Sequence, residues 1–378
     1  MNNYTHFYES HGISPVRQDL SNRRKHFFRR EMLYRQLGLP PQAFRAASVL
    51  EIGPGSGDNA LVTASFAPKR YTLLEPNPTG HEQTKQSLLG ATSEGLELLP
   101  VSLEHFESRD QYDIVLCEGI LPGLDNLYDF LPLLDARVRP GGHLVITCYD
   151  AVSIMFETIR RLIALQIDPS EAPIRARAER LSAAFETHLK TLAGMSRSVE
   201  DWVLDNLLAP PVFHAQTYFS IPDALAYFGK DYFFSQSSPQ FLSNYVWYKE
   251  LPQDPREFNR PLLEDFWSKW HNLLHYQHLY APRVGQSNSE LGGICGQLAG
   301  LLPSRNTDCQ TILALLSALI GNVRDLPEVS RALAECHALF EARDFRPERI
   351  AHAYPLFRHA FGRGQQYLSL SKRTAGGV

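Results

Sequence analysis

The feature of this sequence that most constrains its fold is a glycine-rich turn placed directly after an apolar segment. Residues 48–52 read Ser-Val-Leu-Glu-Ile, and Gly53, Gly55 and Gly57 follow. Because glycine has no Cβ, such a turn lets the backbone approach a ligand closely. A helix is expected to begin near Asp58, so the pattern predicts a strand, a ligand-binding turn and a helix in that order.

Short apolar segments recur after this turn and alternate with stretches long enough for helices. Alternation of this kind predicts a parallel, doubly wound α/β sheet. The sequence Arg-Pro-Gly-Gly at residues 139–142 is expected to break the chain before the fifth segment. The five predicted strands are residues 48–52, 70–74, 96–101, 112–117 and 143–148.

Beyond residue 150 the pattern becomes mostly helical. Residues 231–237 and 241–249 are exceptions, because they are rich in aromatic and β-branched side chains and flank Ser238-Pro239. We interpret them as a terminal antiparallel hairpin. The expected sheet is therefore seven-stranded and mostly parallel, with a C-terminal antiparallel hairpin.

Composition excludes several classes of protein. The net charge of −4 implies no broad basic surface, so nucleic acid is not expected as a partner. No apolar stretch reaches the ~20 residues of a membrane span, and the N-terminus lacks the apolar run of a signal peptide. The five cysteines never form a C-x-x-C pair. A cytoplasmic protein without metal or membrane partner is expected, and the oligomeric state stays open.

The glycine spacing distinguishes between two kinds of ligand. Dinucleotide sites favour G-x-G-x-x-G, whereas this turn reads G-x-G-x-G and continues with Asp58. The carboxylate of Glu51 would repel a pyrophosphate but attract the ammonium of a methionine moiety. Glu75 ends the second predicted strand, where it can accept hydrogen bonds from ribose hydroxyls. The pattern favours S-adenosylmethionine (SAM) over a dinucleotide.

Four features in this order resemble the class I SAM-dependent methyltransferases. They are the turn at residues 51–57, Glu75, Tyr-Asp-Ile-Val at residues 112–115, and Arg-Pro-Gly-Gly at residues 139–142. The resemblance implies a Rossmann-like core that binds SAM and an enzyme that transfers a methyl group. Bacterial enzymes of the same fold also share segments like residues 14–18, 194–205 and 361–367, without a settled substrate.

The resemblance also assigns residues to parts of the cofactor. The glycine turn would hold the methionine and ribose parts of SAM, and Glu75 would hold the ribose hydroxyls. Pro76 and Asn77 would lie beside the adenine. The segment 102–104 after the third strand would clasp the adenine. Many relatives carry an aspartate in this segment, and its equivalent here is Ser102 or Glu104. Glu118 and Gly119 would lie beside the sulfonium. The implied cofactor-binding residues are Glu51, Gly53, Gly55, Gly57, Glu75, Pro76, Asn77, Ser102, Leu103, Glu104, Glu118 and Gly119.

We expect five parts along the chain. They are an N-terminal helical lid (1–45), the SAM-binding core (46–150), a helical insert forming an acceptor pocket (151–224), the hairpin that ends the sheet (225–250) and a helical C-terminal region (251–378). The basic run at residues 23–30 is compatible with binding of RNA or anionic lipid and, more commonly, with a solvated helix face, but we prefer to interpret it as part of the lid.

Candidate acceptor residues fall outside the predicted core. Tyr149 and Asp150 follow the fifth strand, and His214 lies in a loop; these three are the candidate catalytic residues. The candidate substrate-binding residues are Tyr8 and Arg17 in the lid and Asp201, Trp202 and Asp205 on one helix face. An amphipathic helix with a core Trp and solvated acids explains the last three equally well.

A histidine pattern suggests metal binding but is better explained by packing. His271, His275 and His278 fall at i, i+4 and i+7 of a predicted helix that also carries Trp267 and Trp270. A metal site needs a third ligand and a shielded pocket, and no H-E-x-x-H core is present. We therefore expect an aromatic amphipathic helix and no metal.

The predicted function is methylation of an oxygen or nitrogen of a small molecule, such as a sugar or specialised metabolite. The Asn/Asp-Pro-Pro-Tyr/Phe signature of amino-methylating relatives is absent after the fourth strand, where residues 117–122 read Cys-Glu-Gly-Ile-Leu-Pro. Two alternatives stay open: an aminopropyl-type transferase on the same fold, and a SAM- or S-adenosylhomocysteine-binding (SAH-binding) interaction protein without turnover.

Overall fold

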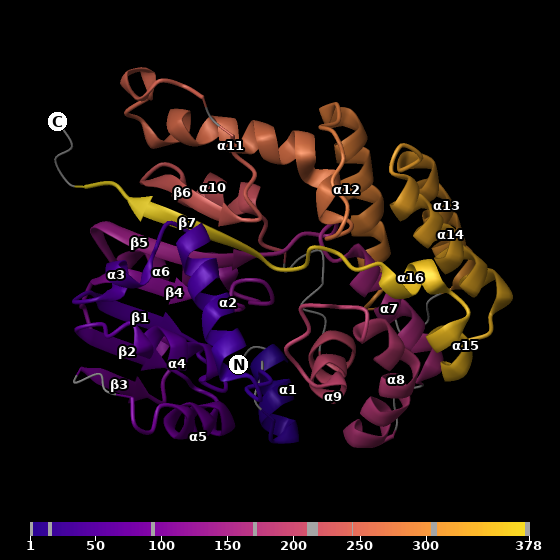
Figure 1. Cartoon of the computed structure of the whole chain (residues 1–378), viewed down its shortest axis with the longest axis horizontal. Coiled ribbons are helices and arrows are strands. Elements are labelled where there is room, and N and C mark those ends of the chain that lie inside the picture. Colours follow the sequence, from indigo (N-terminus) through magenta and orange to yellow (C-terminus); the bar gives the residue numbers. More distant parts are fainter. Residues whose placement is uncertain are drawn as a thin grey trace. The chain divides into compact units, whose positions relative to one another are not determined.

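The computed structural model describes residues 3–13, 17–91, 95–168, 172–209, 218–243, 245–303 and 308–374. Its strands form one seven-stranded sheet in the order β3-β2-β1-β4-β5-β7-β6 (Figure 1). The strands are β1 (Ser48–Ile52), β2 (Arg70–Leu74), β3 (Leu96–Leu99), β4 (Tyr112–Cys117), β5 (Val138–Cys148), β6 (Tyr232–Ser238) and β7 (Gln366–Lys372). Of the helices in the described ranges, none is long and apolar enough to span a membrane.

The parallel part of the sheet confirms the predicted α/β fold. β1 pairs in parallel with β2 on one side and with β4 on the other, and β3 and β5 continue the sheet outward. The strand order therefore reverses beside β1, and ligands of open α/β sheets bind at such a point, beyond the carboxyl ends of the strands. The glycine turn follows β1 directly.

The predicted break before the fifth strand is wrong. Residues 139–142 lie inside β5, whose pairing with β4 shifts register between Tyr112 and Ile114. A Cβ at Gly142 would lie 2.9 Å from the Arg139 carbonyl oxygen and 3.0 Å from that of Asp113. The Pro-Gly-Gly sequence thus forms an irregularity within the strand, because only glycine fits so close to the neighbouring backbone.

The antiparallel end of the sheet is confirmed, but its second strand was placed wrongly. β6 pairs with β7, and β7 pairs in turn with β5. The predicted partner, residues 241–249, forms no strand in its described part, where Tyr245 is 99 % exposed. Leu368 and Leu370 of β7 are fully buried instead, so the last region is not wholly helical.

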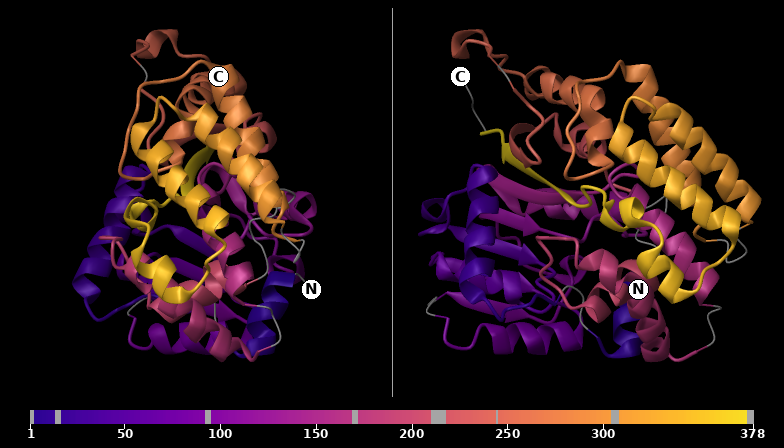
Figure 2. Two further views of the ribbon diagram at one scale, coloured as in Figure 1. Left: turned by 90° about the vertical axis from the view of Figure 1, so that its right-hand side faces the viewer. Right: turned by 45° about the vertical axis from the view of Figure 1, so that its right-hand side comes forward.

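The described residues divide into two compact units. The first comprises residues 1–148, 219–265 and 365–378, and it holds the whole sheet (Figure 2). Within this unit, aromatic rings pack α2 against its neighbours. The ring centroids of Tyr34 and Phe44 lie 5.0 Å apart, and those of Phe44 and Phe66 lie 5.3 Å apart. Its helices are α1 (Asn3–His11), α2 (Arg23–Gln36), α3 (Pro41–Phe44), α4 (Asp58–Ser65), α5 (Pro78–Ser87), α6 (Leu127–Ala136), α10 (Ile221–Phe228) and the short η1 (Leu103–His105) and η3 (Tyr248–Glu250).

The second unit, residues 149–218 and 266–364, is helical. It contains most of the predicted insert (151–224) and most of the predicted C-terminal region (251–378). Its centre holds Arg160, which is fully buried, donates to the Phe357 carbonyl oxygen at 3.1 Å and lies 3.7 Å from the Phe361 ring centroid. Its elements are α7 (Met155–Ile167), α8 (Ile174–Leu189), α9 (Val199–Val203), η2 (Leu204–Leu208), η4 (Trp270–Leu273), α12 (Gly285–Gly300), α13 (Cys309–Asn322), α14 (Pro327–Ala342), α15 (Pro347–His352) and α16 (Pro355–His359); the unit boundary falls within α11 (Pro255–Lys269).

Candidate functional site

The glycine turn has a conformation that other residues adopt poorly. Gly53, Gly55 and Gly57 have φ angles of +67°, +63° and +77°. A Cβ at Gly53 would lie 2.5 Å from the Ile120 side chain, and one at Gly57 would lie 2.7 Å from the backbone of Thr84. The turn therefore requires glycine for both its backbone angles and its close packing.

A cavity of about 890 Å³ opens beside this turn, within the ~300–1,000 Å³ range of small-molecule sites. Its wall contains five of the predicted cofactor residues: Gly53, Pro76, Ser102, Leu103 and Glu104. The further wall residues were not predicted as cofactor ligands, although His105 belongs to the segment expected to clasp the adenine; several of them follow β4 or lie in α6. They are Glu9, Ile52, Leu74, Pro100, Val101, His105, Ile120, Leu124, Asp125, Asn126 and Phe130.

The charge of the cavity wall suits a cationic ligand. Glu9, Glu104 and Asp125 contribute carboxylates, and no Lys or Arg occurs among the described wall residues. SAM carries a sulfonium, an ammonium and one carboxylate, whereas a dinucleotide carries a pyrophosphate that this wall would repel. Size and charge together fit SAM.

Glu75 lies beneath the cavity rather than in its wall. It is buried, and its two carboxylate oxygens accept the backbone N–H groups of Gly55 at 2.7 Å and Asn77 at 2.9 Å. Burial raises the pKa of Glu75 to about 7, although these two hydrogen bonds oppose the shift. Each oxygen keeps a second lone pair, so the predicted ribose contact stays possible in chemical terms. Asn77 caps α5 by accepting the Gly80 N–H at 2.8 Å.

Glu51 is likewise buried at the end of β1 and lies outside the cavity wall. Its carboxylate accepts a hydrogen bond from the Tyr71 hydroxyl. Burial raises the pKa of Glu51 to about 7. The predicted contact with the ammonium of SAM stays a prediction.

Glu118 is held by two side chains of α2. Arg30 Nη2 donates to both carboxylate oxygens, at 2.7 and 2.9 Å, and the Tyr34 hydroxyl donates at 3.0 Å. The next residue, Gly119, donates its N–H to Thr147 Oγ1 of β5 at 2.6 Å. Sequence reasoning treated Arg30 as part of a solvated helix face or lid; its burial shows that the solvated-face reading fails at this position.

The N-terminal segment also contacts the residues after the glycine turn. The Gln18 N–H donates to Asp58 Oδ2 at 2.8 Å, and His26 Nε2 lies 3.1 Å from the Asp58 carbonyl oxygen. Of the predicted lid residues, Tyr8 is buried in α1 and Arg17 is exposed. A role for either in substrate binding stays a prediction.

Tyr149 and Asp150 begin the second unit. Asp150 Oδ1 accepts the backbone N–H groups of Val152 and Ser153, each at 2.9 Å, and the indole N–H of Trp270 at 3.0 Å. Asp150 therefore stabilises a turn through its Oδ1 atom. Tyr149 is half-buried.

Structural contacts also account for the three candidates on the predicted helix face. Asp201 lies in the first turn of α9, whose N-cap is Ser198: the Ser198 hydroxyl accepts the Asp201 N–H at 3.0 Å and donates to the Asp201 carboxylate at 2.7 Å. Asp205 pairs with Arg197 at 2.5 Å. Trp202 is buried. His214 lies outside the described residues.

The predicted helix through the three histidines does not form. α11 ends at Lys269, and the short η4 covers only residues 270–273, so the i, i+4, i+7 face is lost. Burial lowers the pKa of His271 and of His275 to about 4. Within the described ranges, no three His, Cys, Asp or Glu side chains are grouped as a metal site.

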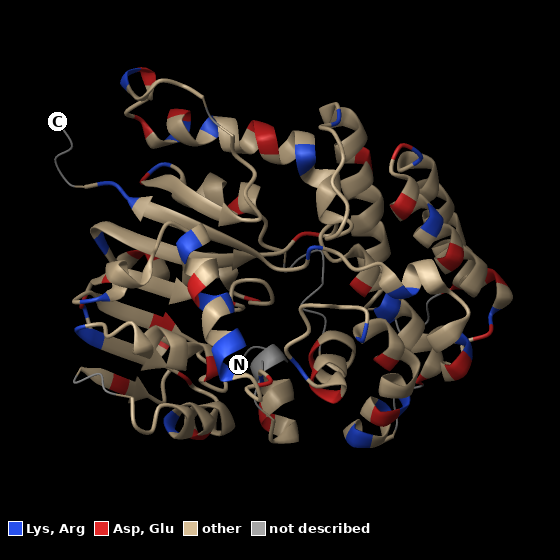
Figure 3. Ribbon diagram, viewed as in Figure 1, with Lys and Arg blue, Asp and Glu red and all other residues tan. Residues whose placement is uncertain are grey.

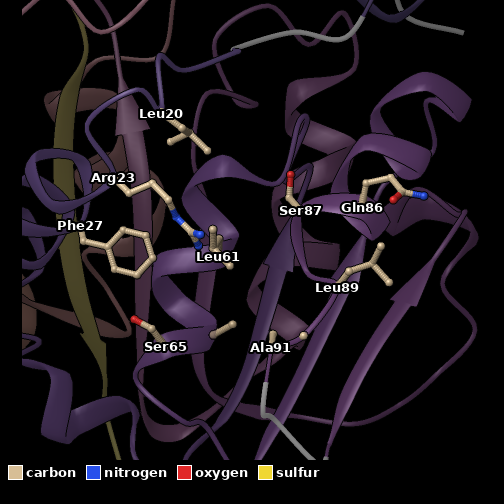
Figure 4. A pocket seen from close by; sticks show the side chains of 11 residues that line it. Leu20, Arg23, Phe27, Leu61, Ser65, Gln86, Ser87, Leu89 and Ala91 are labelled. Atoms are coloured by element: carbon tan, nitrogen blue, oxygen red, sulfur yellow. The ribbon is translucent and has the colours of Figure 1, made fainter.

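A second hollow of about 570 Å³ lies between α2, α4 and α5 (Figure 4). Its wall is mixed, with apolar side chains such as Phe27, Leu61 and Leu89 beside the polar side chains of Arg23, Ser65, Gln86 and Ser87. None of the residues that the sequence predicted for cofactor or acceptor lines it.

Comparison with known proteins connects this geometry to a family. A family model described as a methyltransferase domain matches residues 22–194, which is somewhat less than half of the chain. A curated relative, the tRNA U34 carboxymethyltransferase of Pseudoalteromonas atlantica, is 27 % identical over 113 residues, 28 % of this chain and 32 % of the relative. The match thus spans about a third of that relative's length.

Solved structures give weaker similarity. The N-methyltransferase NodS of Bradyrhizobium japonicum, in complex with SAH, is 19 % identical, with a TM-score of 0.31 over 40 % of this chain and 75 % of NodS. PKMT2 of Rickettsia typhi is also 19 % identical, with a TM-score of 0.35 over 49 % of this chain and 38 % of PKMT2. These scores carry no functional argument. The match to the methyltransferase-domain model, the seven-stranded sheet and the glycine turn agree with one another, and together they support a class I SAM-dependent methyltransferase.

Proposed function

We propose that this chain binds SAM in the cavity beside the glycine turn and transfers its methyl group to an oxygen or nitrogen of a small molecule. The observation that carries the proposal is the cavity itself, which lies at the ligand-binding edge of the sheet and has three carboxylates in its wall. A sugar or specialised metabolite is the proposed acceptor class, because the helical second unit adds a large surface to a minimal core.

Each part of the site has a proposed task. SAM, when bound, supplies a methyl group that the adjacent sulfonium activates. Pro76 and Asn77 would lie beside the adenine, which Ser102, Leu103 and Glu104 would clasp, while Glu75 would hold the ribose hydroxyls. Glu51 and the glycine turn would hold the methionine part, and the Glu118–Gly119 turn would lie on the sulfonium side. Alignment of the acceptor with the methyl group and exclusion of water supply the rest of catalysis.

The acceptor side of the proposal depends on residues after β5. A hydroxyl acceptor must lose its proton as the new bond forms, so a base is needed; a neutral amine can react without one. Tyr149 and Asp150 follow directly on β5, whose carboxyl end lies at the same sheet edge as that of β4. We keep His214 as a further candidate base, and Tyr8, Arg17, Asp201, Trp202 and Asp205 as candidate substrate contacts.

The distribution of charge disfavours a nucleic-acid acceptor. Lys and Arg are interspersed with Asp and Glu along the described elements, as Figure 3 shows, and the net charge is −4. A protein that tracks a phosphate backbone usually gathers its basic residues on one face. The tRNA named for the curated relative nevertheless makes RNA a necessary arm of the test.

The experiment has two stages. Calorimetry with SAM and SAH tests cofactor binding, and failure to bind either ligand would reject the proposal.

In the second stage the protein and methyl-labelled SAM are incubated in separate reactions with sugars, with a small-molecule cell extract and with unmodified tRNA. Label in a small molecule is the expected result. Label in tRNA would overturn the acceptor class, and binding without transfer to any acceptor would favour the non-catalytic alternative. Methyl transfer leaves SAH as the second product, whereas transfer of an aminopropyl-type group leaves labelled methylthioadenosine, so mass spectrometry of the nucleoside product distinguishes the two reactions.

A further inference from the structure

The ion pair between Arg30 and Glu118 joins the N-terminal segment to the edge of the sheet where β4 ends. Their side chains are only 9 % and 15 % exposed, and the shortest N–O distance is 2.7 Å. Burial lowers the pKa of Arg30, but the charge of Glu118, two nearby tyrosines and the hydrogen bond to Glu118 together outweigh it, so that this pKa lies well above its ordinary value. Each side chain therefore depends on the other in a poorly solvated position.

The hydrogen bonds orient the Glu118 carboxylate firmly. Arg30 donates to both of its oxygens, and the Tyr34 hydroxyl adds a second donor to one of them. Tyr34 is itself fully buried, and the Arg30 guanidinium lies 4.9 Å from its ring centroid. Two α2 residues one helical turn apart thus hold the carboxylate from the same side.

This pair connects to the cavity through a short turn. Gly119, with a φ of +75°, is tied to β5 through Thr147, and the next residue, Ile120, forms part of the cavity wall. Ile120 also abuts Gly53, the first glycine of the binding turn. The Glu118 charge therefore lies two residues from the cavity wall, on the side that the proposed function gives to the sulfonium.

We propose that Arg30 is a positioning residue that sets the charge felt by the methyl donor: it orients Glu118 and offsets its negative charge. The inference rests on the proposed function. SAM carries a positive sulfonium, whereas SAH has a neutral thioether, so the two ligands sense this charge differently. The ratio of the SAH dissociation constant to the SAM dissociation constant measures the effect directly and needs no acceptor.

Two single replacements move this ratio in opposite directions. Arg30→Gln leaves the Glu118 charge unbalanced, so SAM gains on SAH and the ratio rises on the order of fivefold. Glu118→Gln leaves the Arg30 charge unbalanced, so the ratio falls by a similar factor. Arg30→Lys keeps the charge and is expected to keep the ratio, although binding of both ligands weakens because the hydrogen-bond geometry changes.

Two further variants make the test decisive. The double variant Arg30→Gln with Glu118→Gln removes both charges, so its ratio of SAH to SAM dissociation constants is expected within about twofold of that of the unmodified chain. It leaves no unpaired buried charge, so it is expected to fold even where a single replacement does not. Arg35→Gln is the matched control, because Arg35 lies on α2 but pairs with Glu31 on the exposed face. The inference is overturned if the folded single variants bind both ligands with an unchanged ratio, or if the double variant shifts as far as a single one. Absence of all SAM and SAH binding by the unmodified chain would instead overturn the proposed function.

Discussion

The backbone N–H of Gly55 donates to Oε2 of Glu75 at 2.7 Å, which joins the glycine turn after β1 to the residue that follows β2. The same carboxylate holds the Asn77 N–H with its other oxygen. Glu75 therefore shapes the turn as well as being the proposed ribose ligand. Substitutions at this position must separate these two tasks.

Replacement of Glu75 by Gln is expected to weaken binding of both SAM and SAH by about tenfold. The amide keeps one acceptor oxygen, so either the Gly55 or the Asn77 N–H loses its partner and the ribose loses a charged acceptor. Calorimetry measures the affinities, and thermal unfolding measures the structural cost. Glu97→Gln on the exposed side of β3 is the control. Unchanged affinity in a folded Glu75→Gln variant would reject the ribose assignment.

Replacement of Gly53 by Ala is expected to lower SAM affinity by more than about tenfold, because the new methyl would collide with Ile120 in the cavity wall. Gly90→Ala is the matched control, since Gly90 has a φ of +85° but no atom lies within 4 Å of the position that its new methyl would take. Both variants carry a backbone strain of about 1 kcal/mol, so the difference between their effects on SAM affinity measures the collision with Ile120. Restoration of binding by adding Ile120→Ala would identify the contact; equal effects of the two glycine changes would argue against it.

The raised pKa of Glu51 predicts a specific pH dependence of stability. Its folded pKa of about 7 lies above the ordinary value of 4.5, so the folded chain holds the proton more tightly than the unfolded chain. This stabilising contribution is complete below pH 4.5 and is lost as the pH rises through 7, by about 3 kcal/mol in all. Urea unfolding of Glu51→Gln should show a correspondingly flatter dependence between pH 5 and 8 than the unmodified chain. Identical slopes would show that Glu51 does not titrate in this range.

Asp150 offers a test of catalysis against structure. Asp150→Asn keeps an oxygen that can accept from Val152, Ser153 and Trp270, so the fold should survive with a loss of about 1 kcal/mol or less. If Asp150 is the proposed base for a hydroxyl acceptor, methyl transfer should fall by at least about 100-fold while SAM affinity is unchanged. SAH formation with the identified acceptor is the measurement. Full activity of the Asp150→Asn variant would show that Asp150 is not the base and serves only to form the turn.

Much of the first unit followed from local sequence. The glycine turn, the parallel strands and Glu75 were predictable because each depends on a short motif with a defined backbone geometry. The partner of β6 was not, because strand pairing depends on contacts between distant segments. The Leu-Ser-Leu-Ser alternation at residues 368–371 was a period-two signal for the missing strand, but the segment is short.

The candidate site was predicted less completely than the fold. Arg30 lies in a run of basic residues, and its contact with Glu118, 88 positions further along, distinguishes it from the exposed Arg23, Arg24 and Lys25. Asp201, Trp202 and Asp205 have the spacing of a binding face, yet helix capping, an ion pair and burial explain them. Spacing indicates which side chains share a face but does not reveal what that face contacts.

The position of β7 has a consequence for how the chain reaches its folded state. This strand lies between β5 and β6 rather than at an edge, yet its residues, 366–372, come after the whole helical unit in the sequence. During synthesis, β5 and β6 emerge from the ribosome long before the strand that separates them. The sheet cannot reach its final register until β7 itself has been synthesised, so nascent chains must keep two unpaired strand edges apart in the meantime.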